Sequence, residues 1–103
     1  MKNPKDFETT RAVYVISVFA EIAGIHPQTI RKYERNGLLD PTRTPGGSRR
    51  FSENDLNKLR HIQSLLSSGL NLEGVRRVLH LEAKVRHLED QIALLNSTRG
   101  YNL

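Results

Sequence analysis

The spacing of apolar residues changes several times along the chain, and each change marks an expected element. A short β-prone run, Tyr14-Val15-Ile16, comes first. Ser17 is a suitable helix N-cap, because its hydroxyl can accept a hydrogen bond from a free amide of the first turn. The apolar positions that follow predict a short amphipathic helix ending at Gly24: Val18, Phe19, Ile22 and Ala23.

A second helix is predicted to begin soon after Gly24. Pro27 suits its first position, where no backbone amide is needed, and Asn36-Gly37 suits its end, where glycine can adopt the left-handed conformation. Ile30 and Tyr33 lie three residues apart and are expected to anchor this helix to the core. Two short helices joined by a Gly-containing turn form a helix-turn-helix. The outward face of the second helix then carries Gln28, Thr29, Arg31, Lys32 and Arg35.

The stretch DPTRTPGGSRRFS predicts a β-hairpin whose tip is Pro45-Gly46-Gly47. Arg43 lies on one arm of this hairpin, and Arg49 and Arg50 lie on the other. A cationic hairpin directly after a helix-turn-helix is typical of a DNA-binding wing.

Two further helices have local start signals. Ser52 and Asp55 can form a capping box, flanked by Phe51 and Leu56 as a hydrophobic staple, and the apolar stripe that follows ends at Gly69. Asn71 caps the next helix in the same way. No Gly or Pro separates that helix from the residues after it, so either the helix continues or a short break divides it near residues 80–81.

From Leu81 the apolar steps become 4, 3, 4 and 3, which is the heptad pattern of a helix that pairs with another helix. Glu82 and Arg86 are spaced for a supporting i,i+4 ion pair. A stripe folded back onto its own domain is the alternative to dimerisation. The expected dimerisation residues are Leu81, Val85, Leu88, Ile92 and Leu95.

Charge is concentrated in one quarter of the chain. The net charge of the 103 residues is +5, and residues 26–50 hold six basic and two acidic side chains. An excess of positive charge scattered along the chain would indicate only solubility, whereas this concentration favours a face that binds a polyanion.

Cysteine is absent, which excludes disulfides and thiolate metal sites. No apolar run approaches the ~18 residues needed to span a bilayer, so we expect a cytoplasmic protein.

Three segments, in order, are similar to motifs of the MerR family of bacterial transcription regulators: TIRKYERNGLL, GSRRFS and GLNLEGVRRVL. The resemblance covers roughly residues 13–95, and within the family it is greatest to the HspR-type heat-shock repressors. It implies a mainly α fold: a winged helix-turn-helix DNA-binding domain over residues 13–80, with a small β-hairpin wing, and a C-terminal coiled-coil dimerisation helix over residues 81–96. Residues 1–12 and 97–103 are expected to be tails.

The resemblance also implies a function. It predicts a nucleoid-associated homodimer that binds double-stranded DNA with an inverted repeat and represses chaperone genes, with the chaperone DnaK as co-repressor. The family's dimerisation helices run antiparallel, although β-branched Val85 and Ile92 at heptad position a by themselves favour a parallel pair. Two rival functions stay open: a nitrogen-type regulator controlled by a metabolic enzyme, and an architectural protein that bends DNA.

Roles for individual residues follow from the resemblance and from the chemistry of base edges. Base readout is expected from the first turns of the second helix. Phosphate contacts are expected from the wing and from the same helix. The base-reading set is His26, Gln28, Thr29 and Lys32, and the phosphate-binding set is Arg31, Tyr33, Arg43, Arg49 and Arg50.

The sequence offers little for catalysis or metal binding. It has no activated nucleophile, no phosphate-binding glycine loop and no acid pair in a plausible pocket, so an enzyme is not expected. His80 and His87 are seven residues apart, too far for the i,i+4 pairing typical of helical metal sites. No metal or other cofactor is therefore predicted.

Overall fold

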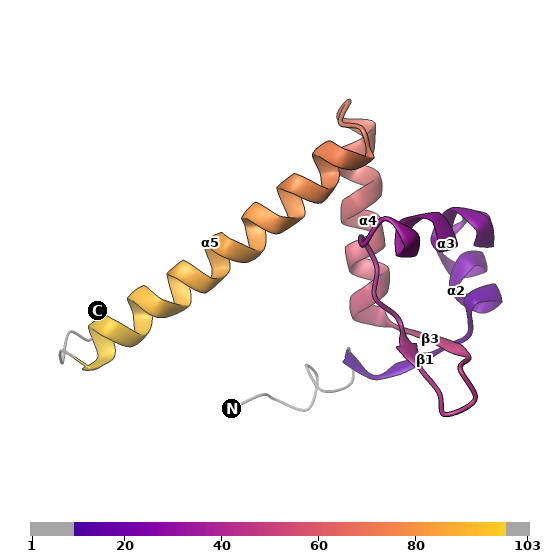
Figure 1. The fold of residues 1–103 in the computed structure, drawn as a ribbon, viewed down its shortest axis with the longest axis horizontal. Helices are drawn as coiled ribbons and strands as arrows, with labels where there is room; N and C mark the ends of the chain where they lie inside the picture. The colour runs from indigo at the N-terminus through magenta and orange to yellow at the C-terminus, as the bar shows by residue number, and fades with distance from the viewer. Residues whose placement is uncertain (1–9, 99–103) are drawn as a thin grey trace.

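The computed structural model describes residues 10–98, which form a small domain with a long helix projecting from it (Figure 1). The fold is mainly helical, as predicted. Its elements follow the chain in this order: β1 (Ala12–Tyr14), α2 (Ile16–Ala23), α3 (Pro27–Arg35), β2 (Thr42–Arg43), β3 (Arg49–Ser52), α4 (Glu53–Ser67) and α5 (Leu72–Thr98).

The start of the domain differs from the sequence prediction. The strand lies two residues earlier than expected, because Ala12 pairs with Ser52 and Tyr14 with Phe51. The helix N-cap is Val15, not Ser17, and no side chain caps it. Pairing with β3 fixes the strand up to Tyr14, so helix α2 can begin at once, with the Phe19 amide donating to the Val15 carbonyl at 2.9 Å.

The helix-turn-helix is confirmed. Gly24 ends α2 in the left-handed conformation, with φ of 70°, which glycine adopts without steric cost. Pro27 occupies the first position of α3, and Gly37 follows this helix with φ of 74°. Ile30 and Tyr33 are buried, as predicted for the residues that anchor the helix.

The hairpin is also confirmed, and it belongs to a larger sheet than expected. Thr42 pairs with Arg50 and Arg43 with Arg49. Strand β1 adds to the other edge of β3, which gives a three-stranded antiparallel sheet in the order β1-β3-β2. The wing is therefore continuous with the strand that precedes the helix-turn-helix.

One aromatic pair joins the hairpin to the helices. The rings of Phe19 and Phe51 stack with centroids 4.3 Å apart and planes 10° from parallel, and both side chains are fully buried. The core around them draws on all four helices, β3 and the loop after α3: Phe19, Ala20, Ile30, Tyr33, Leu38, Leu39, Phe51, Leu59, Ile62 and Val75.

Two helix starts match the predicted caps. The Ser52 hydroxyl accepts from the Asp55 amide at 3.0 Å, and the Asp55 carboxylate accepts from the Ser52 amide at 2.8 Å, which completes the capping box. The Asn71 side-chain oxygen accepts from the Gly74 amide at 2.9 Å at the start of α5. These local bonds fix where α4 and α5 begin.

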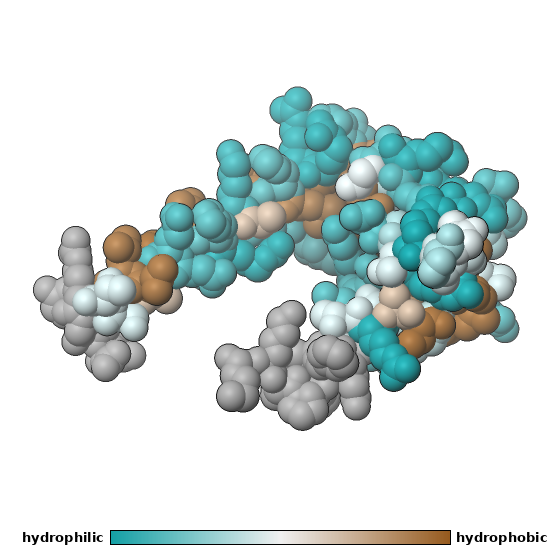
Figure 2. All heavy atoms as spheres, turned by 60° about the horizontal axis from the view of Figure 1, so that its bottom comes forward, coloured by the Kyte–Doolittle hydropathy of each residue, from teal (hydrophilic) through white to brown (hydrophobic). Residues whose placement is uncertain are grey.

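Helix α5 is continuous over 27 residues, with no break at residues 80–81. It is roughly 40 Å long at ~1.5 Å per residue, and its second half extends away from the domain (Figure 1). The stripe does not fold back, because Leu81, Val85, Leu88 and Ile92 are each more than half exposed. Figure 2 shows this apolar surface as brown atoms along the helix.

The ends of the described chain differ from the expected tails. Ala12 already belongs to β1, and α5 continues to Thr98. The remainder of each expected tail, residues 1–9 and 99–103, lies outside the described residues. Among the helices of residues 10–98, none combines the length and apolar character needed to cross a membrane.

A carboxylate on α3 connects this helix to the hairpin. Glu34 accepts from Nε of Arg49 at 2.8 and 3.1 Å and from a guanidinium nitrogen of Arg43 at 3.3 Å. Arg43 also donates to the Gly47 carbonyl at 3.1 Å, across the hairpin tip. Because the Glu34 side chain is only 16% exposed, these charge-assisted bonds are better shielded from water than an ordinary surface pair.

We predict that Glu34→Gln loosens the hairpin, because a neutral amide cannot hold two guanidinium groups. The free energy of unfolding in urea should fall by about 1–2 kcal/mol, and hydrogen exchange should quicken at the Gly47 and Ser48 amides, which bond within the hairpin turn. Glu73→Gln is the matched control, because Glu73 also pairs with two arginines but on α5. Unchanged exchange at the hairpin would contradict the assigned role of Glu34.

Candidate nucleic-acid interface

The outward face of α3 carries the predicted polar residues. Gln28, Lys32 and Arg35 are exposed, and Thr29 and Arg31 are half-buried. On the opposite side Ile30 has no exposed surface. The helix is therefore fixed to the core on one side and presents amide, hydroxyl and cationic groups on the other.

His26 has a local role that the sequence analysis missed. It is the N-cap of α3, where its Nδ1 accepts a hydrogen bond from the Gln28 amide at 3.0 Å. An accepting Nδ1 places the proton of the neutral ring on Nε2. The sequence did indicate this role, because His26 directly precedes Pro27, the first residue of the helix. His26 remains exposed beside Gln28, so capping is compatible with the predicted base contact.

Tyr33 has the dual character that its position predicts. Its side chain is 7% exposed, and burial raises the pKa of its phenol. Among the described residues no side-chain polar atom is buried without a hydrogen-bond partner. The ring thus contributes to the core while the hydroxyl lies at the surface of α3.

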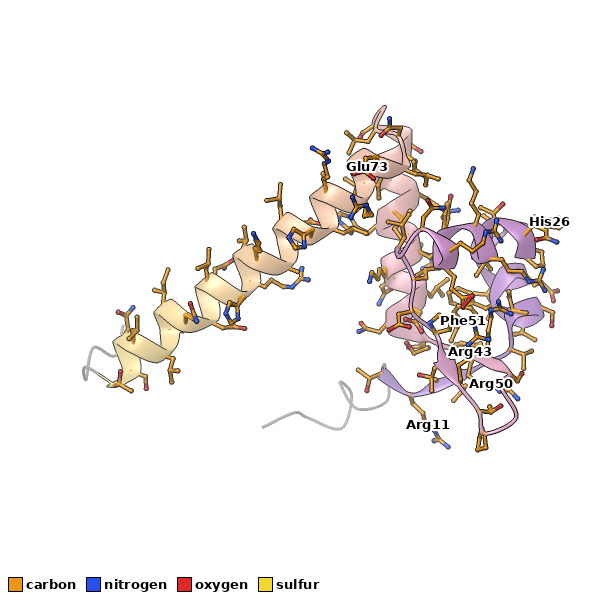
Figure 3. All side chains as sticks on the ribbon, in the orientation of Figure 1. Arg11, His26, Arg43, Arg50, Phe51 and Glu73 are labelled. Carbon is orange, nitrogen blue, oxygen red and sulfur yellow. The ribbon has the colours of Figure 1, made fainter. Side chains whose placement is uncertain are left out.

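The three wing arginines are held by bonds within the hairpin or to α3. Arg43 and Arg49 share the Glu34 carboxylate, which the sequence analysis did not single out. Arg50 donates to the Ser48 hydroxyl at 2.7 Å and to the Arg49 carbonyl at 2.9 Å. Figure 3 shows Arg43 and Arg50 close to the hairpin, with His26 at the outer end of α3. The structure thus places three of the predicted phosphate-binding residues on a hairpin that is tied to the predicted base-reading helix, which carries the other two, Arg31 and Tyr33.

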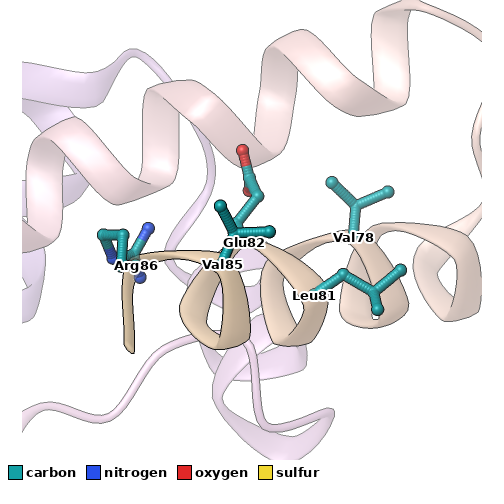
Figure 4. A pocket seen from close by; sticks show the side chains of 5 residues that line it. All are labelled: Val78, Leu81, Glu82, Val85 and Arg86. Atoms are coloured by element: carbon teal, nitrogen blue, oxygen red, sulfur yellow. The ribbon is translucent and has the colours of Figure 1, made fainter. Parts of the chain in front are cut away.

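A groove runs along the inner half of the projecting helix. Its lining is mostly apolar and comes from α5 alone: Val78, Leu81, Glu82, Val85 and Arg86 (Figure 4). Val78 precedes Leu81 by three residues, so it extends the heptad stripe by one position toward the domain. The stripe of apolar residues therefore begins before Glu82, at a point where α5 still lies beside α4.

The predicted pair of Glu82 with Arg86 does not form. Both Glu82 carboxylate oxygens lie 2.9 and 3.0 Å from Nε2 of His61 on α4, and in Figure 4 the Glu82 side chain points toward α4. Sequence spacing along one helix could not reveal this partner, because His61 is 21 residues away. The contact ties α5 to α4 near the point where α5 becomes exposed.

The first turns of α5 carry a second cluster of charges. Glu73 accepts from Arg76 at 2.6 and 3.0 Å and from Arg77 at 3.3 Å. Hydrogen bonds from the two guanidinium groups lower the pKa of Glu73 to about 2. Arg76 and Arg77 are exposed helix residues that share this local partner.

The described residues contain no group of three or more His, Asp or Glu side chains placed to hold a metal ion. His61 and His80 have separate surroundings, since His61 bonds to Glu82 and His80 lines a cleft with Arg35 and Arg76.

Comparison with known proteins gives several relatives. Over 95 residues the chain is 44% identical to a Streptomyces coelicolor protein named heat shock protein HspR, covering 91% of this chain and 63% of that one. It is 37% identical over 75 residues to the HTH-type transcriptional regulator GlnR of Bacillus cereus, covering 73% and 58%. The chain thus spans about three fifths of the length of these curated relatives.

A solved structure and a family description complete the comparison. The fold is similar, with a TM-score of 0.58 and 28% identity, to HiNmlR, a MerR family regulator lacking the sensor domain, which was crystallised bound to promoter DNA. The match covers 84% of this chain and 78% of HiNmlR. Residues 14–82 match the MerR HTH family of regulatory proteins. The chain therefore belongs to the MerR family of helix-turn-helix regulators, which are not enzymes.

Proposed function

We propose that this chain binds double-stranded DNA as a homodimer, with α3 of each protomer in the major groove of one half of an inverted repeat. The observation that carries the proposal is the two-sided character of α3, whose buried Ile30 and Tyr33 fix a helix with an exposed polar face. The DNA-bound state of HiNmlR, a relative of the same fold, supports the same use of this domain.

Base readout is assigned to the N-terminal half of α3. The Gln28 amide can accept from and donate to adenine, Thr29 can contact a thymine methyl group, and Lys32 can reach guanine. The Nε2–H of His26 can donate to a base acceptor because Nδ1 is occupied by the cap. These groups lie on one helix that the core holds rigidly, so they are presented together.

Phosphate binding is assigned to Arg31 and Tyr33 on α3 and to Arg43, Arg49 and Arg50 on the wing. Glu34 holds Arg43 and Arg49 in place before DNA arrives, so less side-chain entropy is lost on binding. The carboxylate also neutralises part of their charge. We therefore assign the two arginines to positioning the protein on the DNA backbone, which carries no direct sequence information.

DNA binding should separate these two roles. With about eight phosphates contacted per dimer, the log–log dependence of affinity on salt should have a slope of about −7, and Arg50→Gln should reduce the slope by about two, one for each protomer. Gln28→Ala should leave the slope unchanged but cost about 1–3 kcal/mol on the specific site. Fluorescence anisotropy on operator and random duplexes measures both effects. A flat salt response would contradict the whole interface.

Dimerisation is assigned to the apolar stripe of α5. Each of its five residues is more than half exposed: Leu81, Val85, Leu88, Ile92 and Leu95. A second copy of the helix is a partner of matching length and pattern. In the antiparallel pairing typical of the family, with Val78 included, the stripe forms matched layers: Val78 opposite Leu95, Leu81 opposite Ile92, and Val85 opposite Leu88.

A charge placed in this stripe should separate the protomers without unfolding them. Leu88→Glu should yield a monomer in sedimentation equilibrium with normal helix content, because Leu88 is 56% exposed and contributes nothing to the domain core. Leu94→Glu is the matched control, since Leu94 lies off the stripe and is 64% exposed. A dimeric Leu88→Glu variant would place the interface elsewhere.

We assign the biological role to repression of heat-shock genes, with DnaK as co-repressor. The support is the resemblance to the HspR-type repressors, together with the 44% identity to the Streptomyces protein of that name. The similarity to GlnR supports a second candidate function: a regulator of the nitrogen type that is controlled by a metabolic enzyme. In either case we expect a cytoplasmic protein associated with the nucleoid.

Adding DnaK to the purified protein should raise its affinity for DNA upstream of chaperone genes, and occupancy of those promoters in genome-wide footprinting should fall after heat shock. The Leu88→Glu variant serves as a control, because a monomer should gain little from the co-repressor on an inverted repeat. If the protein instead occupies promoters of nitrogen-assimilation genes, and this occupancy does not change on heating, the second candidate is favoured. No effect of DnaK on affinity would remove the co-repressor from the proposal.

A further inference from the structure

A cleft lined by cations lies between the C-terminal end of α3 and the helices α4 and α5. Its volume is about 550 Å³, within the range of small-molecule sites. Leu38, which is buried, and Leu79 supply its apolar lining. Its polar lining comes from all three helices and from the turn after α3: Arg35, Asn36, Lys58, Arg76 and His80.

The positive charge of this cleft is incompletely neutralised. No aspartate or glutamate lines it. Within residues 10–98, Arg35 and Lys58 form no salt bridge, and Arg76 shares the single carboxylate of Glu73 with Arg77. The helix dipole favours a cation such as Arg35 at the end of α3, but it does not account for cations contributed by α4 and α5. A bound anion would offset their mutual repulsion.

We propose that this cleft binds a small phosphate-bearing molecule. A guanidinium group offers paired donors to phosphate oxygens, and a lysine ammonium adds a compact charge. Arg76 and His80 are four residues apart and so lie on one face of α5, directed at the same space as Arg35 and Lys58. The apolar side chain of Leu79, which is partly exposed, suits the non-phosphate part of such a ligand.

The position of the cleft favours a free molecule over the DNA backbone. Arg35 is the last residue of α3, and Gln28 lies near its start. Seven residues of helix separate the two by about 10 Å along the axis, so the cleft lies at the opposite end of α3 from Gln28, the residue that we assign to base readout. Glu73, which binds Arg76, lies on α5 near the α4–α5 turn, well away from His26 (Figure 3).

Occupation of the cleft would link the DNA-reading helix to the projecting helix. The ligand would contact Arg35 on α3 and Arg76 and His80 on α5 at once, so it favours conformations that bring these helices close. In the proposed dimer, the angle between α3 and α5 sets the separation of the two reading helices. Ligand binding itself does not depend on the proposed function, whereas this regulatory effect does.

The test begins with pyrophosphate and ATP, titrated into the full chain without DNA at constant ionic strength and followed by calorimetry and amide NMR. We expect saturable binding, with shifts centred on residues 35–38, Lys58 and residues 76–80. The double variant R35Q/K58Q should bind at least about tenfold more weakly. R60Q is the matched control, because Arg60 is exposed on the same helix and does not line the cleft.

Three outcomes would overturn the proposal: absence of saturable binding of either compound, an equal loss of affinity in R60Q, or shifts confined to the wing. A fourth is weaker operator binding by R35Q/K58Q with no binding of free phosphates, since the cleft would then be a DNA contact. Operator affinity is measured separately in each variant. A failure of DNA binding is therefore distinguishable from a failure of the cleft.

Discussion

The stacking of Phe51 on Phe19 is the contact on which the arrangement of the domain depends. It joins the wing strand β3 to the first helix of the helix-turn-helix at 4.3 Å between ring centroids. The residues next to Phe51 extend the connection, because Arg49 bonds to Glu34 of α3 and Ser52 caps α4. Three residues of β3 therefore bind the hairpin to three helices: Arg49, Phe51 and Ser52. These contacts hold the wing although its strands are short.

Features set by neighbouring residues were predictable from the sequence. The capping box of Ser52 and Asp55, the turn at Gly24 and the hairpin tip each depend on a few adjacent positions, and each lies where it was expected. The prediction that Ser17 is the N-cap of α2 was wrong, because the pairing of β1 with β3 determines where α2 begins. Local signals identify an element, but a distant partner decides its exact first residue.

The sequence could nominate residues for the proposed site, but it could not indicate the hydrogen bonds among them. The basic side chains of α3 and the wing could be named from charge and resemblance alone. Glu34 connects two of them because the hairpin packs beside α3, and Glu82 faces His61 instead of Arg86 because α5 packs beside α4. These partners are 9 to 21 residues apart in the sequence. For Glu34 the sequence does give one indication: an acidic residue in a basic segment is expected to bind a neighbouring arginine. It does not indicate which arginine.

Helix α5 joins two different environments without a break. Its first turns contribute Val75 to the core, and from Leu81 onward its apolar stripe is exposed. The His61–Glu82 contact lies at this junction and links the exposed half to α4. Because an uninterrupted helix is stiff, a change in how its first turns sit against α3 and α4 is transmitted along its length. The polar cleft beside Arg76 and His80 lies at this point, so an anion bound there would act where a small rotation moves the far end of the helix most.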